Sequence, residues 1–458
     1  MRNKVFILFF MFSFTVEDKI KSNFVIGIKM LINLVIFNLF LICLLLLTKD
    51  ISVSKGSGKA KEISILLGGG LSGWDSIIKE FENKTGIKVR VVVGPPTTDS
   101  REMMYSISFL TKEQSYDVVY LDVVWLGKFA SANWLENLNS FVDPKEYFRK
   151  NNIFRNYVDS LAYKGQYYAV PVKADAGLLY YRKDLLSKYK LSPPKTYYEL
   201  KEQAKYILKM EKELYNNNDL VGFIFQGKQY EGLVCNFYEV LRGFGYELVD
   251  IDSNNRYYVN VKENELKEVL DYLKGLIEEG VTPKNVINYE EEESRLAFSM
   301  GKVIFARNWP YAIKLLEENK DMREKYGVSV LPGNPPAPTV GGWALAVSAY
   351  SKNKTEAFEF IDFVVNNGMK ELFLKRGDIP TKAELFEDNE IKNSFPYSDV
   401  VLKSLEYSKS RTIHPLYPKI SNIIQIYVSG VLSFKYDTAY ASKEIIKNIQ
   451  KILDTTNF

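Results

Sequence analysis

The chain has 458 residues, too many for one ordinary hydrophobic core and enough for two or three domains. Its 60 basic and 56 acidic side chains leave a net charge of only +4, and this balance argues against nucleic-acid binding. The single histidine, His414, argues against a histidine-based metal site and a Ser-His-Asp triad. We therefore expect neither a metal nor a cofactor.

The chain begins with apolar sequence that is typical of a membrane address. Residues 24–47 carry one charge, Lys29, and the uncharged run from Met30 is barely long enough to span a bilayer. No small-residue cleavage site follows, and Cys43 lacks the small preceding residue of a lipoprotein signal. We expect residues 1–61 to form an N-terminal anchor and flexible tether that hold the protein at the extracellular or periplasmic face of the membrane. Cleavage, lipidation and a start at Met30 stay open.

From residue 62 the pattern alternates between strands and helices. Such alternation predicts an α/β sheet with right-handed crossovers, and ligands bind at the carboxyl ends of its parallel strands. The expected strands are 62–67, 87–93 and 115–122, and the expected helices are 74–86 and 125–138. Later segments add a mostly helical region over 173–300, strands at 302–310 and 326–332, and a buried helix at 356–368. The loops that follow the first three strands are 68–73, 94–101 and 122–125.

The loop at 68–73 matches the G-x-G-x-x-G pattern of dinucleotide-binding folds. That fold also requires an acidic residue at the end of the second strand, where this chain has "VVVGPP". We therefore interpret the segment as a glycine loop whose backbone approaches some other polar ligand.

Carboxylates follow two strands. Asp122 is either a helix N-cap or a ligand contact, and the two roles are compatible. Asp175 is either a ligand contact or half of a surface ion pair with Lys173 or Arg182. We interpret the acidic run 290–293 as a solvated helix face and His414 as a loop residue.

Two tryptophans at strand ends are the strongest signals. Trp309 stands in "ARNWPY" and Trp343 follows Gly341 and Gly342. Both could be core residues. Together with carboxylates at other strand ends, they favour a ligand with apolar faces and many hydroxyls, such as a sugar. In this interpretation the two glycines let a ligand ring lie against bare backbone beside Trp343.

Four stretches, 116–138, 167–200, 300–312 and 330–364, resemble the extracellular solute-binding proteins that serve bacterial and archaeal ABC transporters. Among these, the maltose- and trehalose-binding proteins are the most similar. The resemblance covers nearly all of 62–458. It implies an α/β fold of the two-lobed periplasmic-binding-protein type (type II), with a mostly parallel sheet flanked by helices in each lobe and the ligand in the cleft between lobes.

The resemblance also implies that the chain crosses between lobes near 171, 331 and 377. The N-terminal lobe would then comprise 62–170 plus 332–376, and the C-terminal lobe 171–331 plus 377–458. Carried over residue by residue, it places these ligand contacts: Thr98, Asp99, Arg101, Asp122, Trp125, Asp175, Trp309, Tyr311, Gly342, Trp343 and Arg411.

The function implied is capture of a di- or oligosaccharide by a monomeric, non-enzymatic binding protein, which delivers the sugar to ABC transporter permease subunits through hinge closure. Two alternatives stay open. Asp122 and Asp175 could serve as the carboxylate pair of a glycoside hydrolase. The ligand could also be a non-sugar solute such as a peptide or a polyamine.

Overall fold

The computed structural model describes residues 61–455 except 69, 96–97 and 255. The expected anchor at 24–47 lies outside the described residues. Within the described part of the chain, no helix is long and apolar enough to cross a membrane.

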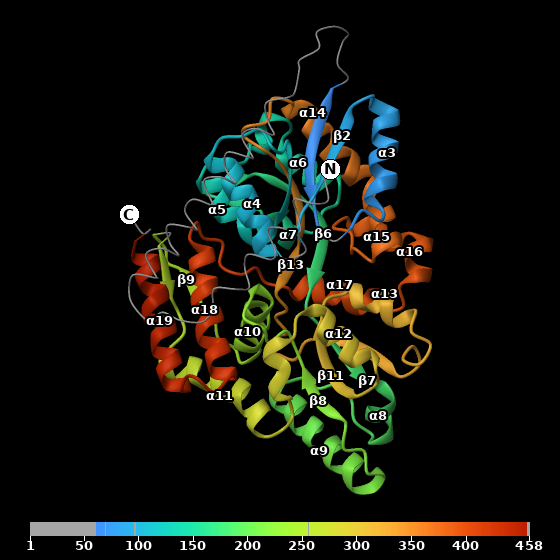
Figure 1. The fold of residues 1–458 in the computed structure, drawn as a ribbon, viewed down its shortest axis with the longest axis vertical. Helices are drawn as coiled ribbons and strands as arrows, with labels where there is room; N and C mark the ends of the chain where they lie inside the picture. Colours follow the sequence, from blue (N-terminus) through green and yellow to red (C-terminus); the bar gives the residue numbers. More distant parts are fainter. Residues whose placement is uncertain (1–60, 69, 96–97, 255, 456–458) are drawn as a thin grey trace, which may run out of the picture. The chain divides into compact units, whose positions relative to one another are not determined.

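The first lobe is built on five strands: β1 (Glu62–Leu67), β2 (Lys88–Val93), β3 (Val118–Asp122), β6 (Ala169–Ala176) and β13 (Val340–Val347). They form a sheet in the order β2-β1-β3-β13-β6 (Figure 1). β1 pairs in parallel with β2 and β3, whereas β13 pairs antiparallel with β3 and β6. Only β13 therefore runs against the other strands of this sheet.

Helices cover the first sheet by burying one apolar face each. They are α3 (Trp74–Thr85), α4 (Thr98–Leu110), α5 (Leu126–Ser131), α6 (Pro144–Lys150), α7 (Arg155–Asp159), α14 (Lys354–Phe363) and α15 (Met369–Arg376). In α3 the buried residues Trp74, Ile77 and Phe81 follow the helical period, and Gly86 ends the helix in the left-handed conformation. The expected helix over 125–138 is wrong beyond Ser131, because Asn133 takes a positive φ of 57°.

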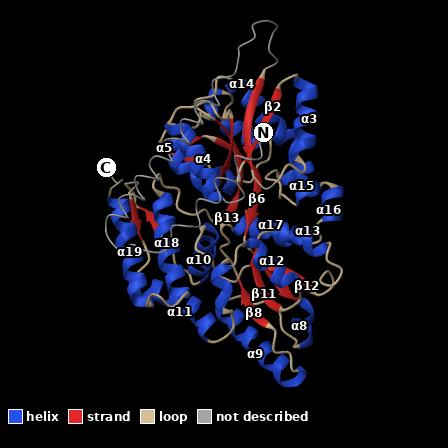
Figure 2. Cartoon of the chain, in the orientation of Figure 1, coloured by secondary structure: helices blue, strands red, loops and turns tan. Residues whose placement is uncertain are grey.

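The second lobe is built on four strands: β7 (Leu178–Arg182), β8 (Val221–Ile224), β11 (Val303–Asn308) and β12 (Tyr326–Val330). Their order is β12-β7-β11-β8. β7 pairs antiparallel with β11 and β12, whereas β8 and β11 are parallel. Each sheet thus has one reversed strand, which confirms the expected fold of two mostly parallel sheets flanked by helices (Figure 2).

The remaining elements surround the second sheet and connect the lobes. The helices are α8 (Lys183–Lys188), α9 (Tyr197–Tyr215), α10 (Glu231–Gly243), α11 (Glu263–Glu278), α12 (Glu291–Ser299), α13 (Tyr311–Glu317), α16 (Asn389–Ser394), α17 (Ser398–Tyr407), α18 (Tyr417–Leu432) and α19 (Thr438–Asp454). The short strands form two hairpins, β4 (Ala162–Tyr163) with β5 (Gln166–Tyr167) and β9 (Val249–Ile251) with β10 (Tyr257–Val259).

The chain passes from one sheet to the other at positions that differ in part from those expected. β6 keeps its pairing with β13 through Ala176, so the first crossing lies at Gly177 rather than near residue 171. The second crossing is the segment 331–339 between β12 and β13. Asp175 therefore lies before the first crossing, in the first sheet, and not just past it.

The close approach at β13 requires its two glycines. Gly342 has φ +113°, and a Cβ there would lie 2.2 Å from the carbonyl oxygen of Lys173 on β6. A Cβ on Gly341 would lie 3.0 Å from the indole of Trp309. We expected a ligand ring to lie against the backbone of these two glycines. In the structure, the indole of Trp309 lies against Gly341, and the carbonyl group of Lys173 lies against Gly342.

We predict that Gly342→Ala lowers the free energy of unfolding by more than Gly280→Ala does. Gly280 also has a positive φ, +72°, but nothing lies within 4 Å of its added Cβ, so its change costs only the conformational term of about 1–2 kcal/mol. Gly342→Ala must in addition displace a backbone carbonyl. Denaturant unfolding of the two variants measures the difference, and equal losses would contradict the prediction.

Candidate functional site

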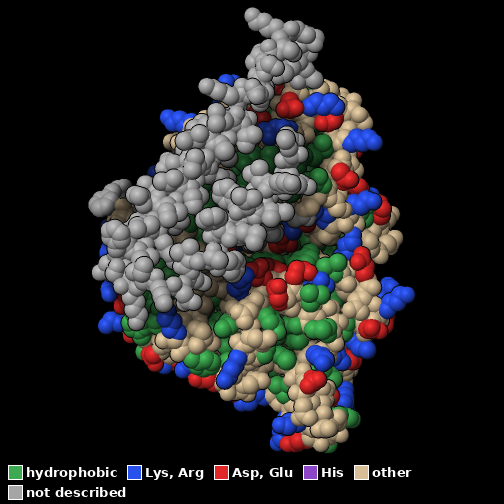
Figure 3. All heavy atoms as spheres, viewed as in Figure 1, with side chains coloured by type: hydrophobic (Ala, Val, Ile, Leu, Met, Phe, Trp, Pro, Cys, Tyr) green, Lys and Arg blue, Asp and Glu red, His purple; other side chains and the backbone are tan. Residues whose placement is uncertain are grey.

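A cavity of about 490 Å³ is lined by side chains from both lobes. Its walls contain six carboxylates, three cationic side chains and four aromatic rings. The lining residues are Thr98, Asp99, Ser100, Asp122, Lys173, Asp175, Lys228, Tyr230, Glu231, Gly232, Cys235, Glu290, Glu291, Trp309, Tyr311, Gly341, Gly342, Trp343 and Arg411. Figure 3 shows acidic side chains gathered near the middle of the face in view.

The sheet register of the first lobe brings two carboxylates beside β13. Trp343 lies opposite Asp122 of β3, and Gly341 lies opposite Asp175 of β6. The side chain of Asp122 also accepts a hydrogen bond of 3.2 Å from the backbone N–H of Val124, which confirms the N-cap role. Asp122 thus both caps the following turn and faces the cavity.

Both carboxyl groups are surrounded by protein. Burial raises the pKa of Asp122 to about 6 and that of Asp175 to about 6. In Asp175, Oδ2 lies 3.3 Å from Nζ of Lys173, whereas buried Oδ1 has no hydrogen-bond partner among the described residues. A ligand hydroxyl or ammonium group would satisfy this oxygen.

Trp343 stands on the first lobe with part of its surface exposed to the cavity. Its indole stacks on Tyr120 at a centroid distance of 4.7 Å and meets Trp125 edge-on at 5.6 Å. The Arg101 guanidinium lies 4.5 Å from the indole centroid. Trp125 and Arg101 are 4% and 7% exposed and do not line the cavity. We expected Trp125 and Arg101 to contact the ligand, but at this cavity they pack against the indole of Trp343 and hold it in place.

Trp309 projects from the end of β11 on the second lobe. Its Nε1 donates to Glu291 Oε1 at 3.2 Å, and the Arg307 guanidinium lies 3.7 Å from the indole centroid. The far edge of the ring reaches Gly341 of the first lobe. Tyr311, two residues later at the start of α13, donates its hydroxyl to Glu292 at 2.6 Å. The two tryptophans thus lie on opposite lobes and in one cavity.

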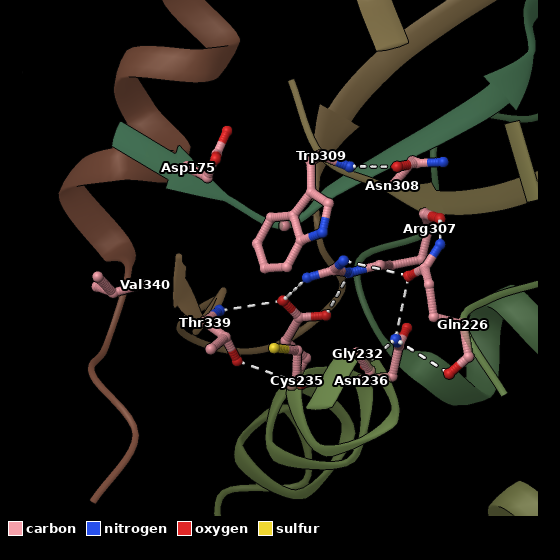
Figure 4. A network of polar contacts seen from close by, with 12 residues as sticks. Asp175, Gln226, Gly232, Cys235, Asn236, Arg307, Asn308, Trp309, Thr339 and Val340 are labelled. Carbon is pink, nitrogen blue, oxygen red and sulfur yellow. Dashed lines mark hydrogen bonds and ion pairs between the residues drawn. The ribbon is translucent and has the colours of Figure 1, made fainter. Parts of the chain in front are cut away.

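A buried polar network holds Arg307 beneath Trp309 (Figure 4). Arg307 forms two hydrogen bonds with Glu239, at 2.6 and 2.8 Å, and a third with Gln226. Glu239 also accepts from the backbone N–H of Thr339 at 3.1 Å, and a Cβ on Gly177 would lie 2.2 Å from it. Because Gly177 and Thr339 belong to the first two crossings, this network joins the aromatic wall to the connections between lobes.

Arg411 enters the cavity from the segment before α18. Its Nη1 lies 2.5 Å from Glu231 Oε1, and its Nη2 donates to the carbonyl of Val340 at 3.1 Å. The buried Nε has no hydrogen-bond partner among the described residues. Thr98 and Asp99, in the first turn of α4, line the same cavity, and burial raises the pKa of Asp99.

Two interpretations of the sequence are wrong. The described residues of the glycine loop do not line the cavity: a Cβ on Gly68 would lie 1.6 Å from the guanidinium of Arg101, and the Gly70 carbonyl accepts from Arg376. The acidic run is not simply a solvated face, because Glu290 and Glu291 line the cavity. The number of acidic residues in a segment does not tell whether they face solvent or, like Glu291, accept a hydrogen bond from the indole of Trp309.

Several wall residues were missed, namely Lys173, Lys228, Tyr230, Glu231, Gly232 and Cys235. Lys228 and Tyr230 lie in the loop at the carboxyl end of β8. Because ligands of α/β sheets bind at the carboxyl ends of the strands, this loop could have been predicted from the sequence. Glu231 carries no such mark, because it begins a helix whose period indicates only a buried face.

His414 is a loop residue, as expected, and it is buried. Burial lowers its pKa to about 4, and its Nδ1 accepts from the backbone N–H of Leu416 at 3.0 Å. Among the described residues, no group of three or more His, Cys, Asp or Glu side chains could hold a metal ion.

Two mostly parallel α/β lobes with a cavity between them define a ligand-binding protein of the two-lobed type. The sequence profile of the bacterial extracellular solute-binding proteins matches residues 67–371, and the chain belongs to this family. It is a family of solute-binding proteins of ABC transporters and not an enzyme family.

Individual proteins agree with this assignment. The "Probable ABC transporter-binding protein" of Deinococcus radiodurans is 35% identical over 69% of this chain and 74% of its own length. The structure of maltose-bound MalE3 from T. maritima has a TM-score of 0.76 and 32% identity, covering 86% of this chain and 100% of that one. An ABC transporter solute-binding protein of Thermotoga lettingae bound with α-D-tagatose has a TM-score of 0.73 and 26% identity over 86% of this chain and 100% of its own.

We predict that Glu239→Gln lowers the free energy of unfolding by about 3–5 kcal/mol, because it leaves the Arg307 charge buried without its counter-ion. The control is Glu80→Gln, which removes an exposed partner of Lys84 and costs at most about 0.5 kcal/mol. Chemical denaturation measures both. A loss in Glu239→Gln as small as in the control would contradict the prediction.

Proposed function

We propose that this protein captures a neutral di- or oligosaccharide, of the maltose or trehalose type, for an ABC importer, without catalysing a reaction. The observation that carries the proposal is the division of the cavity. Each lobe supplies three carboxylates; the first lobe adds Trp343, and the second adds Trp309 and Tyr311. A sugar has apolar C–H faces that pack on indoles and hydroxyls that donate to carboxylates. A maltose-bound structure with 32% identity supports the same ligand class.

The individual roles follow from position. Trp309, Trp343 and Tyr311 offer apolar surface. Asp99, Asp122 and Asp175 offer hydrogen-bond acceptors, and Thr98 and Arg411 also line the cavity. Gly342 keeps β13 close to β6. Trp125 and Arg101 act as positioning residues for Trp343.

Closure follows from the split site. We assign 62–176 and 340–383 to the first lobe and 178–330 and 417–454 to the second, with hinges at Gly177 and at 331–339. The third connection follows residue 383 and does not lie near 377 as expected, because Ile379 pairs with Ala174 and Lys382 pairs with Ile153 of the first lobe. A ligand that bonds both half-sites shifts the population toward the closed state by as much as its extra affinity for that state. The closed protein, a monomer, then docks on permease subunits at the outer face of the membrane. The apolar segment 24–47 is the proposed anchor, and it would keep the local concentration high.

The test is a ligand screen of the purified chain by thermal shift, followed by calorimetry. A ligand that binds only the folded state raises the melting temperature. The panel contains maltose, trehalose, maltotriose, tagatose, a tripeptide and spermidine. Stabilisation by the tripeptide or spermidine alone would overturn the saccharide proposal. Release of glucose from the bound sugars, lost in Asp122→Asn, would instead establish a glycoside hydrolase.

We predict that Trp309→Ala weakens binding of the saccharide identified in the screen by roughly 1–3 kcal/mol, the size of one buried aromatic contact. The matched control is Trp134→Ala. Trp134 is 7% exposed and does not line the cavity, so this change lowers stability and leaves affinity unchanged. Isothermal titration calorimetry measures both affinities, and equal effects in the two variants would remove Trp309 from the site.

We also predict that affinity for a neutral saccharide rises from pH 5 to pH 7. The pKa of Asp122 is raised to about 6, and the ionised form accepts the stronger hydrogen bonds, so binding favours loss of the proton. The change is up to about tenfold for one such group. In Asp122→Asn the pH dependence is smaller and affinity at pH 7 is lower. Titrations in buffers of different ionisation enthalpy report proton release at pH 6, and proton uptake would contradict the assignment.

A further inference from the structure

A second cavity of about 250 Å³ lies between α4 of the first lobe and α18 of the second. Its walls combine apolar and uncharged polar groups with three carboxylates. The lining residues are Thr98, Asp99, Glu102, Met103, Val124, Trp125, Glu231, Tyr417, Pro418, Ser421, Asn422 and Gln425.

The two cavities share a wall. Thr98, Asp99 and Glu231 line both of them. Glu231 is held from the second cavity's side, because Ser421 and Tyr417 donate their hydroxyls to it, while Arg411 pairs with it from the main cavity's side. The second cavity is therefore the neighbouring space that a chain-like ligand in the main cavity would reach by passing Asp99 and Glu231.

The chemistry of the second cavity fits an uncharged, hydroxyl-rich ligand. Met103 is 61% exposed at its rim, opposite exposed Pro418, and both offer apolar surface. Asn422 and Gln425 on α18 offer amide donors and acceptors. Lys128 lies 2.5 Å from Glu102, so this carboxylate already has its counter-ion. No Lys or Arg side chain is among the described lining residues, so nothing there compensates an anionic ligand.

We propose that the second cavity receives the further sugar units of an oligosaccharide whose first units occupy the main cavity. The inference rests on the proposed saccharide function and adds the length of the ligand and the direction in which it leaves. The preferred ligand is then longer than a disaccharide, and its end lies between Met103 and Asn422. Because these residues belong to different lobes, the longer ligand also adds contacts that hold the lobes closed.

The test begins with calorimetric titration of the full chain with maltose, maltotriose and maltotetraose. We expect affinity to rise by about fivefold or more from maltose to maltotetraose, as added C–H surface is buried against Met103 and Pro418. Equal affinity along the series would overturn the proposal while leaving the proposed function intact. Failure of all three sugars to bind would overturn the maltose-type function itself, and the extension with it.

Two variants locate the effect. Met103→Ala removes the rim contact and is expected to abolish most of the gain for maltotetraose without changing maltose affinity. Its control is Ile107→Ala, one turn along α4, which is 56% exposed and lies outside the cavity lining. Asn422→Trp places an indole in the groove, with Ile426→Trp on the same helix as control. An unchanged length dependence in both Met103→Ala and Asn422→Trp would place the added units elsewhere and overturn the proposal.

Discussion

The buried pair of Arg307 and Glu239 is the interaction on which the rest of the site depends. Both side chains are nearly inaccessible, and a buried charge is tolerated only with a well-placed partner. One face of the pair supports the indole of Trp309, while Glu239 also binds the backbone of Thr339 in the second crossing and closes over Gly177 in the first. The aromatic wall of the second lobe is therefore tied to the segments about which the lobes would move.

The second constraint on the site is that Gly341 and Gly342 of β13 have no side chains. Gly342 allows β13 to approach β6, and Gly341 allows Trp309 to reach the first lobe. With these contacts formed, Asp122 and Asp175 face a confined space that also contains the two tryptophans. Confinement is what raises the pKa of each carboxyl to about 6, and the same confinement strengthens their hydrogen bonds to a ligand. The acidic and apolar features of the site thus have a common structural cause.

Much of the fold and part of the site could be predicted from the sequence. Strands and helices such as 62–67 and 74–86 follow from local periodicity, and Asp122, Asp175 and Trp309 were found because each stands at or beside a strand end. Trp343 was expected at a strand end too, but it lies in the middle of β13. The errors are of another kind. Arg101 has suitable chemistry at a suitable place but is buried outside both cavity linings, and Gly68 of the glycine loop lies against it, whereas Trp125 lines the second cavity and not the main one. Glu231 and Glu291 were missed because their role depends on partners about 180 and 18 residues away.

By itself, the sequence determined the α/β class, the two tryptophans and the strand-end carboxylates, because hydrophobic period and turn residues act over a few neighbours. Only the tertiary structure decided which of these groups share a cavity, that the first crossing lies at Gly177, and that a second cavity opens past Glu231. The reason is physical: the cavity wall is assembled from β3, β6, α10, β11, β13 and the segment before α18, and pairings between such distant segments depend on packing across the whole fold rather than on local preference.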